Sequence, residues 1–330
     1  MSDSQPLPST HTTIDADALG HILIDHYSLA SNVVCELLHR GMNDFYLLRA
    51  RDRNLVAQVW RPMTRSEDDV TYEMEFLDHL SGGGVKVPRP HRTEAGDWMI
   101  KVKGPEGIRP VAVFDFVPGR VFSSRPEPAI ARKMGEIFAR IHILSESFDR
   151  ERYGRRIDRA AQIKSSMPAL EALVGHRPSD LNFYREISDA LNLVYLGAEG
   201  DPSIRFGATH GDFHIHNAFV STEGEVTIMD FDACGIDYYV QELMSYRWSI
   251  EKNNLPMMLW EEFLSAYIEL RPLRESEFKH IPAFLVGKEF SYLCGFSHAV
   301  NAIGHVAFHF PGLDWFAKSL RRHVTDAALI

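Results

Sequence analysis

The sequence predicts a two-part protein of the α+β class, with a small strand-rich region followed by a larger helical region. Short runs of aromatic and β-branched residues alternate with turn residues up to about residue 117, and apolar residues recur at helical spacing over most of the remainder. The length of 330 residues suits about two domains. We therefore divide the chain into a flexible tail (1–12), a first lobe (13–117) and a second lobe (118–330).

The first lobe is expected to contain an antiparallel sheet with helices beside it. Leu19, Ile22 and Leu23 recur at helical spacing, and two short apolar runs separated by polar residues indicate a hairpin. Three glycines then stop a second helical pattern. In order, the expected elements are a helix over 14–27, strands at 45–50 and 55–60, a helix over 67–80, and strands between 85 and 117.

The second lobe is expected to be helical with one interruption. Residues 129–144 form a clear amphipathic pattern, two more helical segments precede residue 200, and the pattern from residue 260 to the end is helical again. Residues 206–233 differ, because they form two short strand-like runs around a polar loop. Loops held by strand ends are common positions for catalytic groups.

The composition excludes several classes of function. The chain has 35 Lys and Arg against 45 Asp and Glu, a net charge of −10. Binding to nucleic acid or to anionic lipid depends on clustered cations, so we expect neither a nucleic-acid partner nor a membrane partner. The acidic balance is compatible with a cationic small molecule.

The cysteines and the termini point to the cytoplasm. Cys35, Cys234 and Cys294 lack Cys-x-x-Cys spacing, which argues against a disulfide framework and a structural zinc site. No Lys or Arg precedes Arg40, so the basic region of a secretory signal is missing. The apolar stretch 284–310 carries Lys, Glu and His residues and is too polar to span a bilayer. We therefore expect a cytoplasmic protein.

The densest group of chemically useful side chains lies in residues 209–217, Thr-His-Gly-Asp-Phe-His-Ile-His-Asn, and 13 residues after Asn217 a short apolar strand ends at Asp230. Phosphoryl transfer needs a carboxylate near the attacking hydroxyl, together with Asn and Asp oxygens for magnesium. His210, Asp212 and Asn217 have the His-x-Asp-x₄-Asn spacing of a kinase catalytic loop. The pattern therefore predicts a phosphotransferase.

These motifs resemble the aminoglycoside phosphotransferase/choline kinase family of protein-kinase-like small-molecule kinases. The residues that carry the resemblance are 210–217, Ile-Met-Asp-Phe-Asp at 228–232, and Glu-Leu at 242–243, with looser matches at 41–46, Glu73 and 112–119. Within the family, the chain is most similar to the group of stress-response kinase A and homoserine-kinase-like proteins. The resemblance covers about residues 15–320 and implies a two-lobed protein-kinase-like fold that uses ATP and Mg²⁺.

The resemblance also implies roles for individual residues. Asp212 resembles the carboxylate that orients or deprotonates the acceptor hydroxyl, and His210 resembles a residue that braces the loop. The resemblance implies Asn217 and Asp230 as metal ligands, with Asp232 as a further metal residue. The implied nucleotide-binding residues are Asn43, Gln58, Glu73, Asp115, Phe116 and Val117. The last three lie in the linker that meets the adenine.

The chain departs from the family pattern at Gln58. The family has a Lys or Arg at this strand position, where it pairs with the helix Glu, here Glu73, and with the phosphates. Glutamine carries no charge, and Arg61, three residues on, points to the opposite face of a regular strand. Arg49 on the neighbouring strand is another possible substitute. His216 also differs, because the family usually has a small residue there.

Three alternatives to a small-molecule kinase remain open from the sequence. Gln58 is compatible with a nucleotide-binding pseudokinase, and the family includes protein Ser/Thr kinases of the stress-response type. The alternating His210, His214 and His216 are also compatible with a metal-dependent hydrolase. The acceptor is expected to be a hydroxyl-bearing amino sugar, amino alcohol, amino acid or nucleoside, and the acidic balance favours a cationic one. A monomer and a homodimer are both compatible with the sequence.

Overall fold

The computed structural model describes residues 9, 11–62, 65–148, 156–303 and 312–330, with the side chains of 298–303 excepted. Its internal contacts divide the chain into two compact units. The first unit comprises Met1–Arg120 with Phe219–Asp232, and the second comprises Val121–Ala218 with Ala233–Ile330. The predicted α+β fold class is confirmed, because the first unit contains an antiparallel sheet and the second is mainly helical.

An antiparallel sheet forms the centre of the first unit. Its strand order is β1-β2-β3-β6-β4, and β5 also pairs with β6. The predicted hairpin is present as β2 and β3, whereas β1 was not predicted. Most β1 side chains are exposed, so this strand lacks the alternation of a half-buried strand. The strands are β1 Val34–Arg40, β2 Asp44–Arg49, β3 Asn54–Val59, β4 Pro90–His91, β5 Ile100–Gly104 and β6 Gly107–Asp115.

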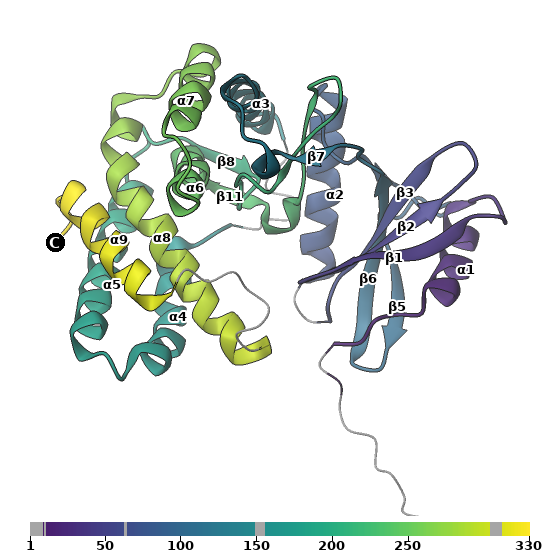
Figure 1. Ribbon diagram of the computed structural model, residues 1–330, viewed down its shortest axis with the longest axis horizontal. Helices are drawn as coiled ribbons and strands as arrows, with labels where there is room; N and C mark the ends of the chain where they lie inside the picture. The colour runs from purple at the N-terminus through teal and green to yellow at the C-terminus, as the bar shows by residue number, and fades with distance from the viewer. Residues whose placement is uncertain (1–8, 10, 63–64, 149–155, 304–311) are drawn as a thin grey trace, which may run out of the picture. The chain divides into compact units, whose positions relative to one another are not determined.

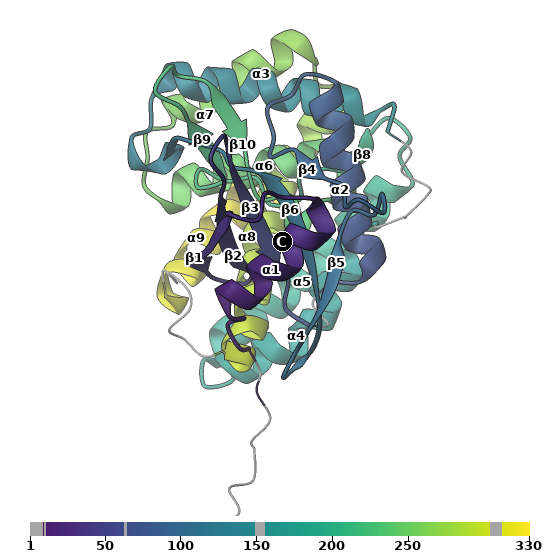
Figure 2. The ribbon, with the colours of Figure 1, turned by 90° about the vertical axis from the view of Figure 1, so that its right-hand side faces the viewer.

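Helices α1 (Ala16–Tyr27) and α2 (Glu67–Gly82) lie on opposite sides of this sheet (Figures 1 and 2). The α1 side buries an apolar cluster that includes Leu55, Ala57 and Val59 of β3. Because strand side chains alternate between faces, Gln58 points to the side of α2. The start of α2 is fixed by a capping box in which Ser66 and Asp69 satisfy each other's backbone N–H groups.

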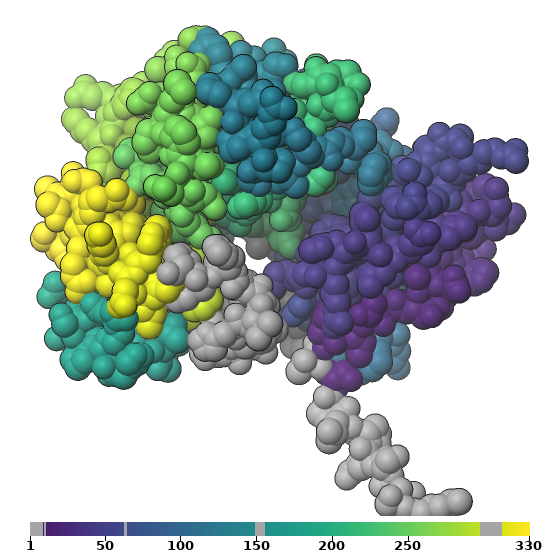
Figure 3. Space-filling model, in the orientation of Figure 1, coloured from purple at the N-terminus to yellow at the C-terminus, as the bar shows by residue number. Residues whose placement is uncertain are grey.

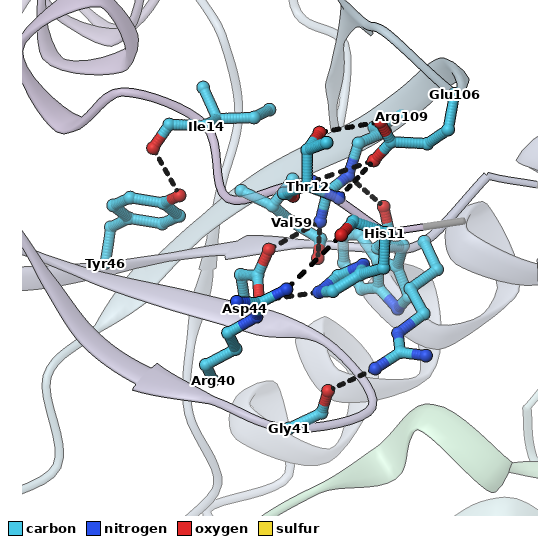
Figure 4. A network of polar contacts seen from close by, with 12 residues as sticks. His11, Thr12, Ile14, Arg40, Gly41, Asp44, Tyr46, Val59, Glu106 and Arg109 are labelled. Atoms are coloured by element: carbon cyan, nitrogen blue, oxygen red, sulfur yellow. Dashed lines mark hydrogen bonds and ion pairs between the residues drawn. The ribbon is translucent and has the colours of Figure 1, made fainter. Parts of the chain in front are cut away.

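A buried ion pair stabilises the α1 side of the first unit (Figure 4). Arg109 and Asp44 are both fully buried, and the Arg109 Nη2 lies 2.8 Å from the Asp44 Oδ2. His11 Nε2 lies 3.1 Å from the other carboxylate oxygen of Asp44. The Thr12 hydroxyl donates to Glu106 over 2.6 Å. His11 and Thr12, which the sequence analysis assigned to the tail, are therefore held against the sheet.

Residues 219–232 belong with the first unit by their contacts, although the sequence analysis placed them in the second lobe. They include most of β9 (Ala218–Val220), all of β10 (Val226–Ile228) and the start of the 3₁₀ turn Phe231–Ala233. The Ile228 N–H donates to the Lys86 carbonyl over 3.1 Å. Phe231 packs edge-on against Phe76 of α2, with ring centroids 6.0 Å apart. These contacts join segments far apart in the sequence.

The second unit consists of helices around a two-stranded antiparallel sheet of β8 (Phe206–Thr209) and β11 (Gly235–Tyr238). Helix α3 packs closely on α7, where an added Cβ on Gly135 would lie 2.1 Å from the Phe263 carbonyl oxygen. Over the described residues, no helix combines the length and apolar character needed to cross a bilayer. The helices are α3 Pro128–Ser145, α4 Arg159–Val174, α5 Pro178–Glu199, α6 Tyr239–Lys252, α7 Met258–Leu270, α8 Glu275–Ile303 and α9 Leu313–Asp326. Before α3, the chain forms the short strand β7 (Arg120–Val121) and the 3₁₀ turn Phe122–Ser124.

The C-terminal helix α9 is attached to the second unit by charged side chains. Figure 3 shows α9 (yellow) beside the start of α5 (teal), where Arg321 pairs with Asp180 over 2.8 Å. On its inner side, His323 contacts Glu289 of α8 and Glu251 of α6, the latter over 2.8 Å. Burial lowers the pKa of His323, but the two carboxylates outweigh it and raise the pKa to about 9.

Stability is expected to fall as the pH rises from about 6.5 to about 9. The pKa of His323 is higher in the folded chain than its ordinary value of 6.5. The contribution of His323 to the free energy of unfolding is therefore complete below pH 6.5 and is lost as the pH rises to about 9, where the folded chain also loses the proton. The shift corresponds to on the order of 3 kcal/mol. Urea denaturation at both pH values should show this loss in the wild type and a smaller loss in His323→Gln. His176→Gln, at an exposed position, should behave like the wild type.

Candidate active site

Residues 210–217 form the loop that follows β8 in the second unit, and a glycine fixes its path. Gly211 has a φ of +87°, a conformation that favours glycine. A Cβ at this position would lie 2.0 Å from the Ala233 carbonyl oxygen. The Gly211 N–H donates to the Glu242 Oε1 over 2.7 Å. The loop therefore packs directly on the backbone at residue 233 and is anchored to α6.

A buried chain of hydrogen bonds continues from this anchor. Glu242 Oε2 lies 2.6 Å from His142 Nε2, and His142 Nδ1 lies 2.8 Å from the Tyr267 hydroxyl. Burial raises the pKa of Glu242 to about 7 and lowers the pKa of His142 well below its usual value. Sequence reasoning missed His142 and Tyr267, because they lie on α3 and α7, far from the loop in the sequence. Their hydrogen bonds fix the side chain that holds the loop.

His210 makes its contacts within the loop and with the aromatic side chains around it. Its side chain is fully buried, and its Nδ1 accepts a hydrogen bond from the Asp212 N–H over 3.3 Å. The ring also lies among aromatic side chains, 5.9 Å from that of Phe213. These contacts hold the loop backbone and leave the Asp212 side chain directed elsewhere.

The Asp212 carboxylate is half-exposed and carries its charge beside a lysine. Its exposed fraction is 44%, and its Oδ1 accepts from Lys288 Nζ of α8 over 2.7 Å. Desolvation alone raises the pKa of Asp212, but Lys288 and His214 outweigh it and hold the pKa well below its usual range. Burial, Lys288 and His216 lower the pKa of His214 to about 4, despite the opposing charge of Asp212. Asp212 is therefore ionised and His214 neutral near pH 7.

Asn217 lies directly beside Asp212. Its side-chain Nδ2 donates to the Asp212 carbonyl oxygen over 3.1 Å, and its own N–H donates to the His214 carbonyl over 2.9 Å. The residue is 6% exposed. The side-chain amide nitrogen of Asn217 is hydrogen-bonded within the loop, so a metal ion would bind to the amide oxygen.

The two other predicted metal residues lie in the first unit. Asp230 has a φ of +65°, which is uncommon for a residue other than glycine and is often found at functional sites. Asp232 Oδ2 accepts from Asn43 Nδ2 over 2.7 Å, although 189 positions separate the two residues. The structure thus brings Asn43, predicted as a nucleotide-binding residue, to the predicted metal loop.

The partner of Glu73 is Arg65, which the sequence analysis did not consider. The Arg65 Nη2 lies 3.3 Å from the Glu73 Oε2, and both side chains are at most 5% exposed. The Arg65 Nη1 lies 3.3 Å from the Asp232 Oδ1 and also donates to the Asp232 carbonyl. Arg65 therefore links the helix glutamate to the predicted metal loop.

The two arginines proposed from sequence lie elsewhere. Arg61 donates to the Gly41 carbonyl over 2.7 Å, and Arg49 pairs with the exposed Glu36 over 2.9 Å. Gln58 is 7% exposed, and its buried Nε2 has no hydrogen-bond partner among the described residues. Arg65 lies just before the N-cap of α2, outside the helical spacing, so no local pattern in the sequence indicated its contact with Glu73.

The predicted linker residues follow β6, the strand next to β3. His91 Nε2 lies 2.7 Å from Asp115 Oδ1, and the Phe116 N–H donates to the Asn54 carbonyl over 3.3 Å. Phe116 and Val117 are both partly exposed. The candidate residues are thus grouped within their own units: the first holds Asn43, Gln58, Glu73, Asp115, Phe116, Val117, Asp230 and Asp232, and the second holds His210, Asp212 and Asn217.

The histidines of the loop do not form the cluster that a zinc or iron hydrolase needs. In the part of the chain that the structure describes, no three His, Cys, Asp or Glu side chains are placed to hold one metal ion. His210 is instead hydrogen-bonded to the loop backbone, and His214 lies 3.8 Å from Asp212. The geometry therefore favours the kinase interpretation of the motif.

Comparison with known proteins shows the same architecture. An amicoumacin kinase solved in complex with AMP-PNP, Ca²⁺ and Ami has a TM-score of 0.74, with 18% identity, over 95% of this chain and 93% of that chain. A microcompartment-associated aminopropanol kinase has a TM-score of 0.67, with 19% identity, over 96% of both chains. These likenesses confirm the kinase-like fold.

Relatives by sequence cover most of the chain. An uncharacterized protein of Deinococcus radiodurans is 28% identical over 330 residues, 97% of this chain and 94% of that protein. A homoserine kinase of Rhodopseudomonas palustris is 25% identical over 292 residues, 86% of this chain and 85% of that protein. The model of the phosphotransferase enzyme family matches residues 35–276. The chain therefore belongs to the phosphotransferase enzyme family, as its motifs indicated.

Proposed function

We propose that the protein transfers the γ-phosphoryl group of ATP to a hydroxyl group of a small molecule, with Mg²⁺ as the metal. The observation that carries the proposal is Asp212, an ionised and half-exposed carboxylate on a tightly braced loop. Asn217, the last residue of the His-x-Asp-x₄-Asn motif, is hydrogen-bonded to the backbone of Asp212. Relatives whose names state homoserine kinase activity support a small acceptor.

The reaction forms one bond and breaks one bond. The acceptor oxygen attacks the γ-phosphorus and forms a new P–O bond, while the bond to the bridging oxygen breaks and its electron pair leaves with ADP. The acceptor proton passes to Asp212 or to solvent. Because the transition state of phosphoryl transfer is loose, little deprotonation is needed before attack. The low pKa of Asp212 therefore suits a group that accepts a hydrogen bond and orients the hydroxyl.

The residues available for the metal fit magnesium. Asn217, Asp230 and Asp232 offer amide and carboxylate oxygens, the hard ligands that Mg²⁺ prefers. The unusual backbone of Asp230 is a structural sign of a constrained functional position. When bound, the ion neutralises charge on the nucleotide phosphates. The amicoumacin kinase with AMP-PNP and Ca²⁺ supports a divalent ion with a nucleotide in this fold.

We assign the cation of the nucleotide site to Arg65 in place of the missing strand lysine. Arg65 contacts Glu73 and Asp232, so it lies where the family pairs a lysine with its helix glutamate. The orphaned Nε2 of Gln58 is a buried donor that a phosphate or another acceptor of the nucleotide would satisfy. Asn43 and the linker 115–117 complete the proposed nucleotide set.

Phosphorus NMR tests the proposed function directly. The protein is incubated with MgATP and, in separate samples, with L-homoserine, 1-amino-2-propanol, choline, an aminoglycoside, a nucleoside and a serine-containing peptide. We expect ADP and one new phosphomonoester signal in equal amounts with a small acceptor. A signal only with the peptide would replace the proposal by a protein kinase. Bound MgATP with no ADP in any sample would replace it by a pseudokinase.

A further inference from the structure

A second lysine, Lys252, is affected by the charge of Asp212 and contacts Tyr292 on the helix that carries Lys288. Lys252 is the last residue of α6, and its Nζ donates to the Tyr292 hydroxyl of α8 over 2.9 Å. The ammonium also lies over two aromatic faces, 4.3 Å from the ring centre of Tyr292 and 5.1 Å from that of Trp248. Tyr292 follows Lys288 by four residues, so their Cβ atoms are neighbours about 5–6 Å apart on one helix face.

The charge of Lys252 is not matched by a carboxylate. Among the described residues, no Asp or Glu oxygen lies within ion-pair distance of its Nζ, whereas Lys288 pairs with Asp212. Its neighbour Glu251 is occupied by Arg247, Arg322 and His323. Burial lowers the pKa of Lys252, and the charge of Asp212 opposes this effect. Of the two lysines beside Asp212, one is therefore left without a counter-charge.

Such a site is poorly suited to a cationic acceptor. An amino sugar or a quaternary amine placed at Asp212 would meet two ammonium groups, and Asp212 already shares its charge with Lys288. The net charge of −10, which favoured a cationic acceptor, belongs to the whole chain. The local charge around the catalytic carboxylate has the opposite sign.

We propose that the acceptor is a small hydroxy compound that carries an oxyanion, a carboxylate or a phosphate, and that Lys252 binds this group while Asp212 orients the hydroxyl. The proposal rests on the proposed function, because Asp212 is the acceptor residue only in a kinase. The Tyr292 hydroxyl, held by Lys252, provides a further polar contact for the oxyanion. The short separation of Lys288 and Tyr292 on α8 limits the distance between hydroxyl and oxyanion to that of a few carbon atoms.

Ligand-induced thermal shifts with the intact protein test this proposal. The probes are D-glycerate and glycerol 3-phosphate as anions, and 1-amino-2-propanol and choline as cations, each at millimolar concentration. We expect stabilisation by at least one anion and by neither cation. Glycerate and glycerol 3-phosphate then show whether the site prefers a carboxylate or a phosphate. Stabilisation by a cation alone, or by no probe, would overturn the proposal.

Three variants separate Lys252 from other causes. Lys252→Met should weaken binding of the anion about tenfold or more, since a hydrogen bond to a charged group is lost. Lys252→Arg should retain most of the affinity, and Lys279→Met, which removes an exposed lysine from α8, should bind as the wild type does. If Lys252→Met binds the anion as tightly as the wild type does, Lys252 is not the oxyanion-binding residue, whatever the affinity of Lys252→Arg.

A parallel titration with MgADP distinguishes the two proposals. If MgADP stabilises all variants and the phosphorus NMR assay yields ADP and a phosphomonoester, but no anion stabilises the protein, the acceptor class is wrong and the kinase proposal stands. If anions bind through Lys252 while MgADP does not bind, the oxyanion site stands and the kinase proposal fails. The anions should still bind with saturating MgADP, and loss of anion binding under that condition would show that they occupy the nucleotide phosphate positions and would overturn the proposal.

Discussion

Replacement of Asp212 by Asn is expected to lower kcat for phosphotransfer by about 10³-fold, within the range for loss of a positioned acid–base group. Asparagine has nearly the same size but lacks the negative charge that orients the acceptor hydroxyl. The hydrogen bond from Asn217 is retained, because it goes to the backbone oxygen of residue 212. The half-exposed position predicts only a small change in melting temperature.

The assay for this variant is ADP formation with the acceptor found by phosphorus NMR. KM for ATP should change little, because Asp212 acts on the acceptor. Asp201→Asn is a matched control, since Asp201 is a carboxylate of the second unit whose Oδ1 accepts from the backbone N–H and the hydroxyl of Ser203. Near-wild-type turnover of Asp212→Asn at equal stability would contradict the assignment of Asp212.

Replacement of Arg109 by Met is expected to destabilise the first unit by about 3–5 kcal/mol, the usual result of breaking a buried ion pair. Arg109 and Asp44 are both fully buried, so Asp44 would keep a charge with less compensation. Arg109 also donates to the backbone carbonyls of Trp60 and Thr12, which would lose their partner. Methionine fills part of the volume, so the charge and hydrogen bonds are the main loss.

Hydrogen exchange of the backbone amides in β2, β3 and β6, measured together with the melting temperature, reports the loss of stability in the first unit. Arg49→Met is the control, because its pair with Glu36 is about half-exposed and is expected to contribute at most about 1 kcal/mol. The double variant Arg109→Met with Asp44→Asn should recover part of the lost stability. Equal stability of Arg109→Met and Arg49→Met would show that the buried pair is not a main support of the sheet.

The sequence predicted the fold class because its periodicities are local. The β2–β3 hairpin and helix α3 each have the alternation or helical spacing of their element over a short segment. β1 was missed because most of its side chains are exposed. The association of 219–232 with the first unit was also missed, because contacts such as Phe231 with Phe76 have no counterpart in local spacing.

The grouping of the candidate loop residues could be predicted because their spacing is contained in one short segment. His210, Asp212 and Asn217 lie within eight residues, and the structure places their side chains as a braced group. The surroundings could not be predicted in the same way. Lys288 reaches Asp212 from 76 positions away, and Arg65 reaches Asp232 from 167 positions away. The departure at Gln58 was visible in the sequence, but the contacts of Arg65 with Glu73 and Asp232 were not.

A calorimetric titration with ATP, with and without Mg²⁺, tests whether the chain binds a magnesium nucleotide through the proposed residues. The titration is made on the wild type, Asp230→Asn and Arg65→Met. We expect magnesium-dependent binding to the wild type, loss of the magnesium dependence in Asp230→Asn, and affinity about tenfold lower or more in Arg65→Met. Absence of ATP and GTP binding to the folded wild type, or equal magnesium-dependent binding to all three proteins, would show that the proposed nucleotide and metal residues are wrong.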